Sequence, residues 1–150
     1  MFEESVDSFL ARWRSLAAEV EVFSRVENDP LLEFMAGDVI LHALERTNPY
    51  LPRVGRNRVI IHAVCESVAA GEPPALVEVT GISNIRVTAP VLRAEPPFVI
   101  VDAGFPLVVG VLGGFGHLTA GELISFESVP PLQAFVLEET AGTVRTELEL

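Results

Sequence analysis

The chain has 150 residues, of which 49% are hydrophobic, and a formal net charge of −11. This length and apolar content predict one folded domain over residues 1–150 and exclude a disordered chain. The acidic charge would repel a phosphate backbone, which disfavours nucleic acid as a partner.

Residues 1–47 carry two patterns that predict helices. Between residues 3 and 28, apolar side chains recur every three or four positions, which is the spacing of an amphipathic helix. A second helix is expected over residues 30–45, because Pro30 suits the first helical position, with Gly37 as its weak point. The first pattern also fits a short heptad repeat, so pairing between subunits stays an alternative to packing within the chain.

Residues 57–70 fit both a helix and a strand. Asn57 suits a helix cap and Gly71 suits a helix end, whereas the β-branched residues of RVIIHAV favour a strand. The balance predicts a third helix in the C-terminal half of this segment. The N-terminal part is therefore expected to hold two or three helices.

Residues 75–139 predict strands. Pro-Pro pairs at 73–74, 96–97 and 130–131 are each followed by an apolar run, and each pair should lead into a strand because proline disfavours helix. The runs FVIVDA and PLVVGVL do not alternate, so both of their faces should be covered. Five to six such strands predict a small antiparallel β-barrel or curved sheet, and with the helices an α+β domain.

The segment VLGGFGHLTAGELISFE, residues 111–127, raises the question of phosphate binding. Its glycines match neither GxGxxG nor GxxxxGK, and all ten basic residues of the chain are arginines, so no P-loop lysine exists. No long helix follows to supply N–H groups to a phosphate, so a turn between strands is expected.

The uncharged stretch 103–121 is nineteen residues long and overlaps the glycine segment. Its six glycines and Pro106 disfavour a membrane-spanning helix. No membrane span is therefore predicted. Peripheral membrane attachment through residues 103–118 is a remaining alternative.

Single acids and one histidine are candidates for a pocket. Asp38 and Asp102 stand out as acids within apolar sequence, and His117 lies in the glycine segment. Asp102 and His117 together suit acid–base chemistry at a barrel mouth. The competing interpretations are a loop histidine bonded to backbone or water, and an aspartate that accepts from a turn amide.

Basic residues gather in RTNPYLPRVGRNR, residues 46–58, which holds four arginines and no acid. Arginine forks bind carboxylates and phosphates in a bidentate way, so this segment is the candidate site for an acidic partner or a small anionic ligand. The candidate residues are Arg46, Tyr50, Arg53, Arg56 and Arg58. The competing interpretation pairs these arginines with the protein's own acidic surface or with a neighbouring subunit.

Metal and cofactor sites are not predicted. His42 with Glu45, and His62 with Cys65 and Glu66, supply only two or three ligands each, without the repeated spacing of a zinc site. As the only cysteine, Cys65 can form no internal disulfide, which suits a reducing cytoplasm.

Taken together, the composition and motifs of the sequence favour a cytoplasmic, non-catalytic module that forms a homo-oligomer through its apolar excess. Its arginine segment would contact an acidic partner, a second copy or an anionic ligand. The alternative is a small-molecule enzyme with a site at the barrel mouth, in which Asp102 and His117 act and the arginines hold an anionic substrate.

Overall fold

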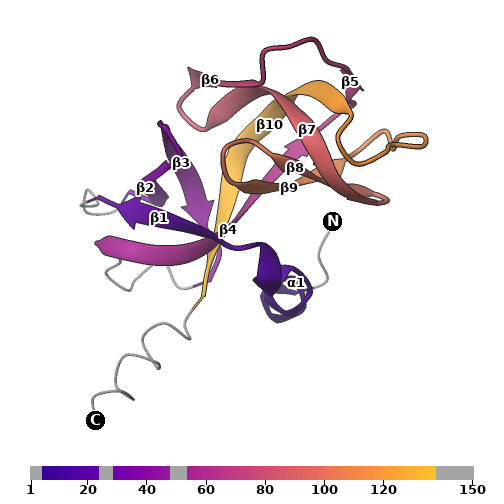
Figure 1. Ribbon diagram of the computed structural model, residues 1–150. Helices are drawn as coiled ribbons and strands as arrows, with labels where there is room; N and C mark the ends of the chain where they lie inside the picture. The colour runs from indigo at the N-terminus through magenta and orange to yellow at the C-terminus, as the bar shows by residue number, and fades with distance from the viewer. Residues whose placement is uncertain (1–4, 24–28, 48–53, 138–150) are drawn as a thin grey trace, which may run out of the picture.

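The structure is built almost entirely from β-strands (Figure 1). The computed structural model describes residues 5–23, 29–47 and 54–137. Within these ranges one helix, α1 (Val6–Trp13), continues into a 3-10 turn, η1 (Arg14–Leu16). The strands that follow are β1 (Ala18–Val22), β2 (Leu31–Ala36), β3 (Val39–Glu45), β4 (Gly55–Cys65), β5 (Ala69–Ala70), β6 (Leu76–Gly81), β7 (Asn84–Glu95), β8 (Phe98–Asp102), β9 (Pro106–Val111) and β10 (Leu123–Val136).

Eight of these strands close into a mixed β-barrel. The order is β10-β3-β2-β1-β4-β9-β8-β7, and β7 pairs back onto β10. The β10–β3 and β4–β9 pairs are parallel, whereas the other pairs around the barrel are antiparallel. Two further strands attach to it, β5 to β10 and β6 to β7.

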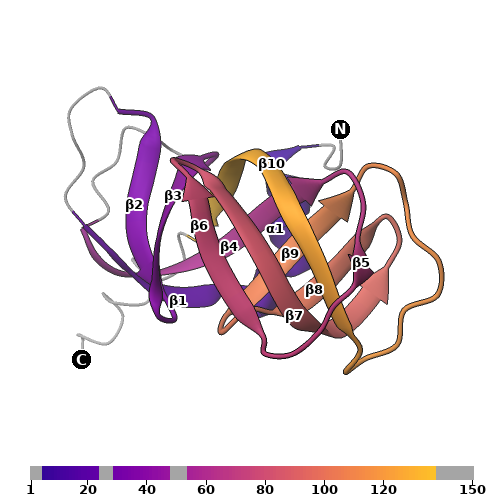
Figure 2. The same cartoon turned by 90° about the horizontal axis from the view of Figure 1, so that it is seen from above.

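Strands β4 and β10 also pair with each other and divide the barrel into two lobes (Figures 1 and 2). Along β4, residues 55–59 pair with β1 and residues 61–65 with β9. Along β10, residues 123–127 pair with β7 and residues 132–134 with β3. One lobe therefore holds β1–β3, the other holds β7–β9, and the same two strands close both.

A buried polar cluster holds the point where β10 passes from one lobe to the other. The β10–β4 register shifts after Val129, around the two prolines of β10. Before this shift, the Ser128 hydroxyl accepts from the Ile85 amide at 3.0 Å and donates to Asn84 Oδ1. After it, the Ser83 hydroxyl accepts from a β10 amide at 2.9 Å and donates to a β3 carbonyl. These side chains accept hydrogen bonds from two buried amides on either side of the interrupted ladder, so those amides are satisfied without a strand partner.

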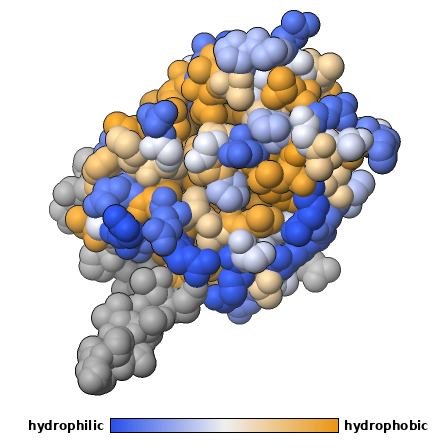
Figure 3. All heavy atoms as spheres, in the orientation of Figure 1, coloured by the Kyte–Doolittle hydropathy of each residue, from blue (hydrophilic) through white to orange (hydrophobic). Residues whose placement is uncertain are grey.

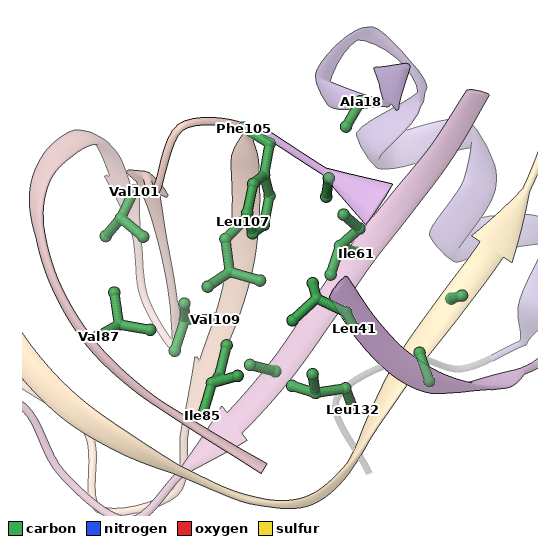
Figure 4. Packing of buried hydrophobic residues seen from close by; sticks show 14 of the residues in the cluster. Ala18, Leu41, Ile61, Ile85, Val87, Val101, Phe105, Leu107, Val109 and Leu132 are labelled. Atoms are coloured by element: carbon green, nitrogen blue, oxygen red, sulfur yellow. The ribbon is translucent and has the colours of Figure 1, made fainter. Parts of the chain in front are cut away.

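Inward-facing side chains from both lobes form one hydrophobic core (Figure 4). They alternate along β1, β2 and β3, as expected for strands with one face inside a barrel. Fully buried members include Leu41, Ile61, Leu107, Val109 and Leu132.

A second hydrophobic cluster lies outside the barrel, beneath α1. Phe9 and Trp13 project from α1 onto aromatic residues of β8 and β10. The Phe9 and Phe135 ring centroids are 4.4 Å apart, and Trp13 meets Phe98 edge-on at 5.2 Å. Strand β8 therefore has one face in the core and the other under α1, which confirms that FVIVDA is covered on both faces.

Charged side chains hold α1 against the β7–β8 hairpin. The Arg12 guanidinium lies 4.6 Å from the Trp13 ring centroid and 4.9 Å from that of Phe98. It also forms an ion pair with Glu95 at 3.0 Å, and Glu95 is bonded to Arg93 at 2.8 Å. The aromatic faces and the carboxylate together fix the guanidinium, which favours one docked position of the helix.

The structure corrects the predicted α+β fold. The pattern of residues 3–28 is helical only as far as Leu16, and AEVEV from Ala18 forms β1. The predicted helix over residues 30–45 is the β2–β3 hairpin, in which Gly37, at a φ of 57°, begins a two-residue loop. Residues 55–65, which overlap the predicted third helix, form β4. Alternating and β-branched residues decide these segments because each finds a strand partner.

The C-terminal prediction is confirmed in part. A β-barrel is present, but it has eight strands and mixed pairing rather than five or six antiparallel strands. The Pro-Pro pairs at 73–74 and 96–97 precede β6 and β8, whereas the pair at 130–131 lies within β10. The glycine segment joins β9 to β10 and leads into a strand, as expected.

We expect Phe9→Ala to lower the free energy of unfolding by about 3–5 kcal/mol, because it removes the aromatic contact between α1 and the barrel. Trp13 is the only tryptophan, so its emission should shift to the red as the helix loosens. Urea unfolding followed by fluorescence measures both effects. Ser15→Ala, at an exposed position, is the control, and an equal effect of the two variants would contradict this packing.

A second prediction concerns the crossover of β10. Ser128→Ala should cost about 1–3 kcal/mol, because it leaves the Ile85 amide without its acceptor. Ser125, on the same strand as Ser128, makes only a half-buried hydroxyl contact with Thr88 of β7, so Ser125→Ala should cost less than about 1 kcal/mol. Thermal unfolding of the two variants compares them. Equal melting temperatures would show that the Ser128 bonds do not hold the crossover.

Candidate functional site

Two adjoining hollows that share Asp38 and Val39 form a groove between β6 and the β2–β3 hairpin. Strand β6 pairs with β7 along one edge, and no strand in the described ranges pairs with its other edge. Strand β3 faces the same gap, because β10 joins it only at residues 43–45. The groove is therefore bordered by two strand edges as well as by side chains.

The shallow end of the groove is apolar. It encloses about 810 Å³ between the outer face of the hairpin and the end of β6. Its apolar side chains are unusually exposed, with Ile82 at 77% and Val79 at 52%. Figure 3 shows hydrophobic side chains at the surface on the side where β3 and β6 lie. The lining residues are Met35, Asp38, Val39, Ile40, His42, Val79, Gly81 and Ile82.

The deep end of the groove is acidic. It encloses about 410 Å³ between residues 75–77, the hairpin loop and the β8–β9 turn. Asp38 and Asp102 are both among its lining residues. The two turns approach so closely that a Cβ on Gly37 would lie 3.2 Å from the Gly104 carbonyl oxygen. This close approach brings together two acids that are distant in sequence.

The charges around the groove favour a cation. Within the described ranges, no arginine lines either end. The nearest basic side chain on the β6–β7 hairpin, Arg86, is held by Glu78 at 3.4 Å and Glu127 at 3.5 Å. His42 lies 3.5 Å from Glu33. The field in the groove is therefore set mainly by Asp38 and the β8–β9 turn.

The residues predicted to share a pocket lie at opposite ends of β9. Asp102 precedes this strand and His117 follows it, and its six residues span about 16 Å at 3.3 Å per residue. Asp102 accepts from the Gly104 amide at 3.0 Å, as the turn interpretation expects. His117 is exposed, with Nε2 at 3.4 Å from the Thr119 hydroxyl. The structure thus places Asp102 with Asp38, not with His117.

The predicted arginine segment is described only in part, because Tyr50 and Arg53 lie outside the described residues. Arg46 donates to Gln133 Oε1, and its guanidinium lies 5.3 Å from the Phe135 ring centroid. The other two positions lie on β4.

On β4, Arg56 is 3.8 Å from Glu19 across the exposed surface. Arg58 is half-buried, and its carbonyl accepts from the Leu137 amide at 2.9 Å. Arg56 therefore contacts an acid of the protein's own surface, as the competing interpretation expects, whereas the Arg46 contacts described above are with a glutamine and an aromatic ring. Binding of an acidic partner or an anion by this segment stays a prediction.

The two sets considered as metal ligands are arranged by strands, not by a helix. His62 lies under α1, with Nδ1 at 2.9 Å from the Val108 carbonyl oxygen, whereas Cys65 is in the barrel core. Glu45 is buried and contacts the Thr47 hydroxyl. Among the residues that the structure describes, no three His, Cys, Asp or Glu side chains gather as a metal site would require.

Sequence reasoning missed the apolar walls of the groove. A helix over residues 30–45 would place Met35 and Ile40 away from β6 altogether. The alternation in LLEFMA and the Gly37-Asp38 pair were the available signals for a hairpin. The prediction of a helix rested instead on Pro30, which suits a first helical position.

Comparison with known proteins gives no family. No protein-family model matches the chain, and no curated protein matches it. None of the helical segments that the structure describes has the length and apolar character needed to cross a bilayer.

The buried thiol gives a prediction of pH dependence. Burial raises the pKa of Cys65 from 9.0 to about 11, and the Glu66 carboxylate adds to the rise. The folded state therefore keeps this proton to higher pH than the unfolded state. The resulting stability should be complete below pH 9 and fall as the pH rises towards 11, by at most about 3 kcal/mol.

Urea unfolding between pH 7 and pH 11 measures this effect. Cys65→Ala, compared with the natural chain at each pH, should lack this part of the alkaline slope. Parallel curves for the two chains would contradict a shifted Cys65.

Proposed function

We propose that the protein is an interaction module that binds an extended segment of another protein along the open edge of β6. The observation that carries the proposal is the groove, which joins an unpaired strand edge to exposed apolar side chains. Strand addition uses both features: main-chain hydrogen bonds give affinity, and alternate side chains enter the groove.

The open edge supplies the hydrogen bonds. A strand with one unpaired edge presents N–H and C=O groups that another chain can pair with. The β6–β7 ladder is regular from Leu76 to Val79, and its register shifts before Gly81. The regular edge is thus about four residues long, which matches a short docked segment.

The walls supply apolar contact. Ile82, Val79 and Ile40 expose 77%, 52% and 41% of their surface, and burial of apolar surface favours binding by about 25 cal/mol per Å². Exposed apolar surface concentrated beside polar strand edges is typical of an interaction site.

A single segment suits the groove better than a second copy. The β2–β3 hairpin stands opposite β6, so the occupant must fit between two walls, whereas the sheet edge of a folded copy brings its own neighbouring strands. Two copies would also each carry a net charge of −11. Self-association, contact through the arginine segment and a cytoplasmic location remain predictions from the sequence.

The test is binding of a neutral octapeptide of alternating valine and threonine, acetylated, amidated and labelled with fluorescein. Fluorescence anisotropy should show saturable binding to the full chain. The double variant Ile40→Ser/Ile82→Ser should weaken it by about tenfold, as the loss of two apolar contacts implies.

The matched control, Val54→Ser/Leu112→Ser, removes two exposed apolar side chains elsewhere and should leave the affinity unchanged. Absence of saturable binding, or equal weakening by both double variants, would overturn the proposal. So would a dimer, detected by light scattering, that only the groove variant dissociates, because the occupant would then be a second copy.

A further inference from the structure

The two ends of the groove differ in chemistry, so the groove favours one orientation of a bound segment. The start of β6 lies at the deep end with Asp38 and Asp102. The end of β6 lies at the shallow end, among Met35, Ile40 and Ile82. Asp102 lines the deep end alone, whereas Asp38 lines both ends. A docked segment therefore meets two acids at one terminus, and mainly apolar side chains at the other.

The strand directions decide which terminus meets the carboxylates. Strand β6 is antiparallel to β7, β7 is antiparallel to β10, and β10 is parallel to β3. Strands β6 and β3 therefore run the same way on the two sides of the groove. A segment that is antiparallel to one is antiparallel to both, and antiparallel pairing is slightly more stable per residue. Such a segment has its C-terminal end at the start of β6.

The deep end is built for a positive charge. Both carboxylates belong to exposed residues, and no described side chain forms an ion pair with either of them. Two like charges lining one cavity attract a cation and repel an anion. A free C-terminal carboxylate would be repelled, so the segment must be internal to the partner chain.

On the basis of the proposed function, we infer that the partner segment runs antiparallel to β6 and carries a lysine or arginine at its C-terminal end. That side chain lies between Asp38 and Asp102, while apolar residues nearer the N-terminal end of the segment cover Val79 and Ile82. The groove thus selects both the sequence and the direction of its partner.

Three labelled peptides test the inference: the neutral octapeptide, a version with lysine at its C-terminal position, and a version with lysine at its N-terminal position. All are acetylated and amidated. The peptide with the C-terminal lysine should bind about three- to fivefold more tightly than the one with the N-terminal lysine. The difference should shrink between 50 and 500 mM NaCl, because salt screens exposed charges.

The double variant Asp38→Asn/Asp102→Asn should abolish this difference, and its affinity for the neutral peptide is measured beside it as the reference. Asparagine at position 102 still accepts from the Gly104 amide, so the turn is kept. The control Asp7→Asn/Glu21→Gln removes two exposed charges on α1 and β1 and should keep the difference.

The outcomes separate the two proposals. If the natural chain binds none of the three peptides, the proposed function is overturned. Binding of the neutral peptide with equal affinity for the two lysine peptides would overturn only the inference about charge. Tighter binding of the N-terminal lysine peptide would show a segment parallel to β6 and overturn the inferred direction.

Discussion

The pairing of β4 with β10 is the constraint on which the rest of this structure depends. Each strand uses one edge for the other and divides its second edge between the two lobes. Because β10 contains Pro130 and Pro131, its ladder is interrupted where it changes lobes, and the hydroxyls of Ser83 and Ser128 accept from the Leu132 and Ile85 amides beside the interruption. A buried polar cluster of this kind is costly when incomplete, so it specifies one register for both lobes.

The groove follows from the same crossover. At the point where β10 changes lobes, β7 leaves the second edge of this strand and β3 joins the same edge further along. The Ser83 hydroxyl binds a β3 carbonyl there, and beyond this contact β6 and β3 diverge without pairing. The candidate site is thus the gap between the lobes, and its walls belong to elements that the crossover positions.

The sequence was most informative where backbone chemistry acts locally. The strands after residue 75 are predictable because proline and β-branched residues exclude helix there. The strands within residues 18–45 are harder to predict, because apolar spacing compatible with a helix occurs there together with the alternation of a strand. Only pairing partners distant in the chain decide between helix and strand. Asp38 and Asp102 are individually conspicuous acids in the sequence. Their shared cavity depends on two turns 64 positions apart meeting, which no local pattern encodes.

The pairing of β3 with β10 joins strands that are far apart in the sequence, and this affects how the chain folds. Ala43 pairs with Leu132, 89 positions later, and β4 finds its central partner in the same late strand. Contacts of such high sequence separation slow folding, because much of the chain must be ordered before they form. During synthesis neither lobe can close until β10 has left the ribosome. The lobe that holds β1–β3 is synthesised first, but it stays incomplete until β10, the last strand, is available. The two lobes should therefore form and be lost together, as one cooperative unit.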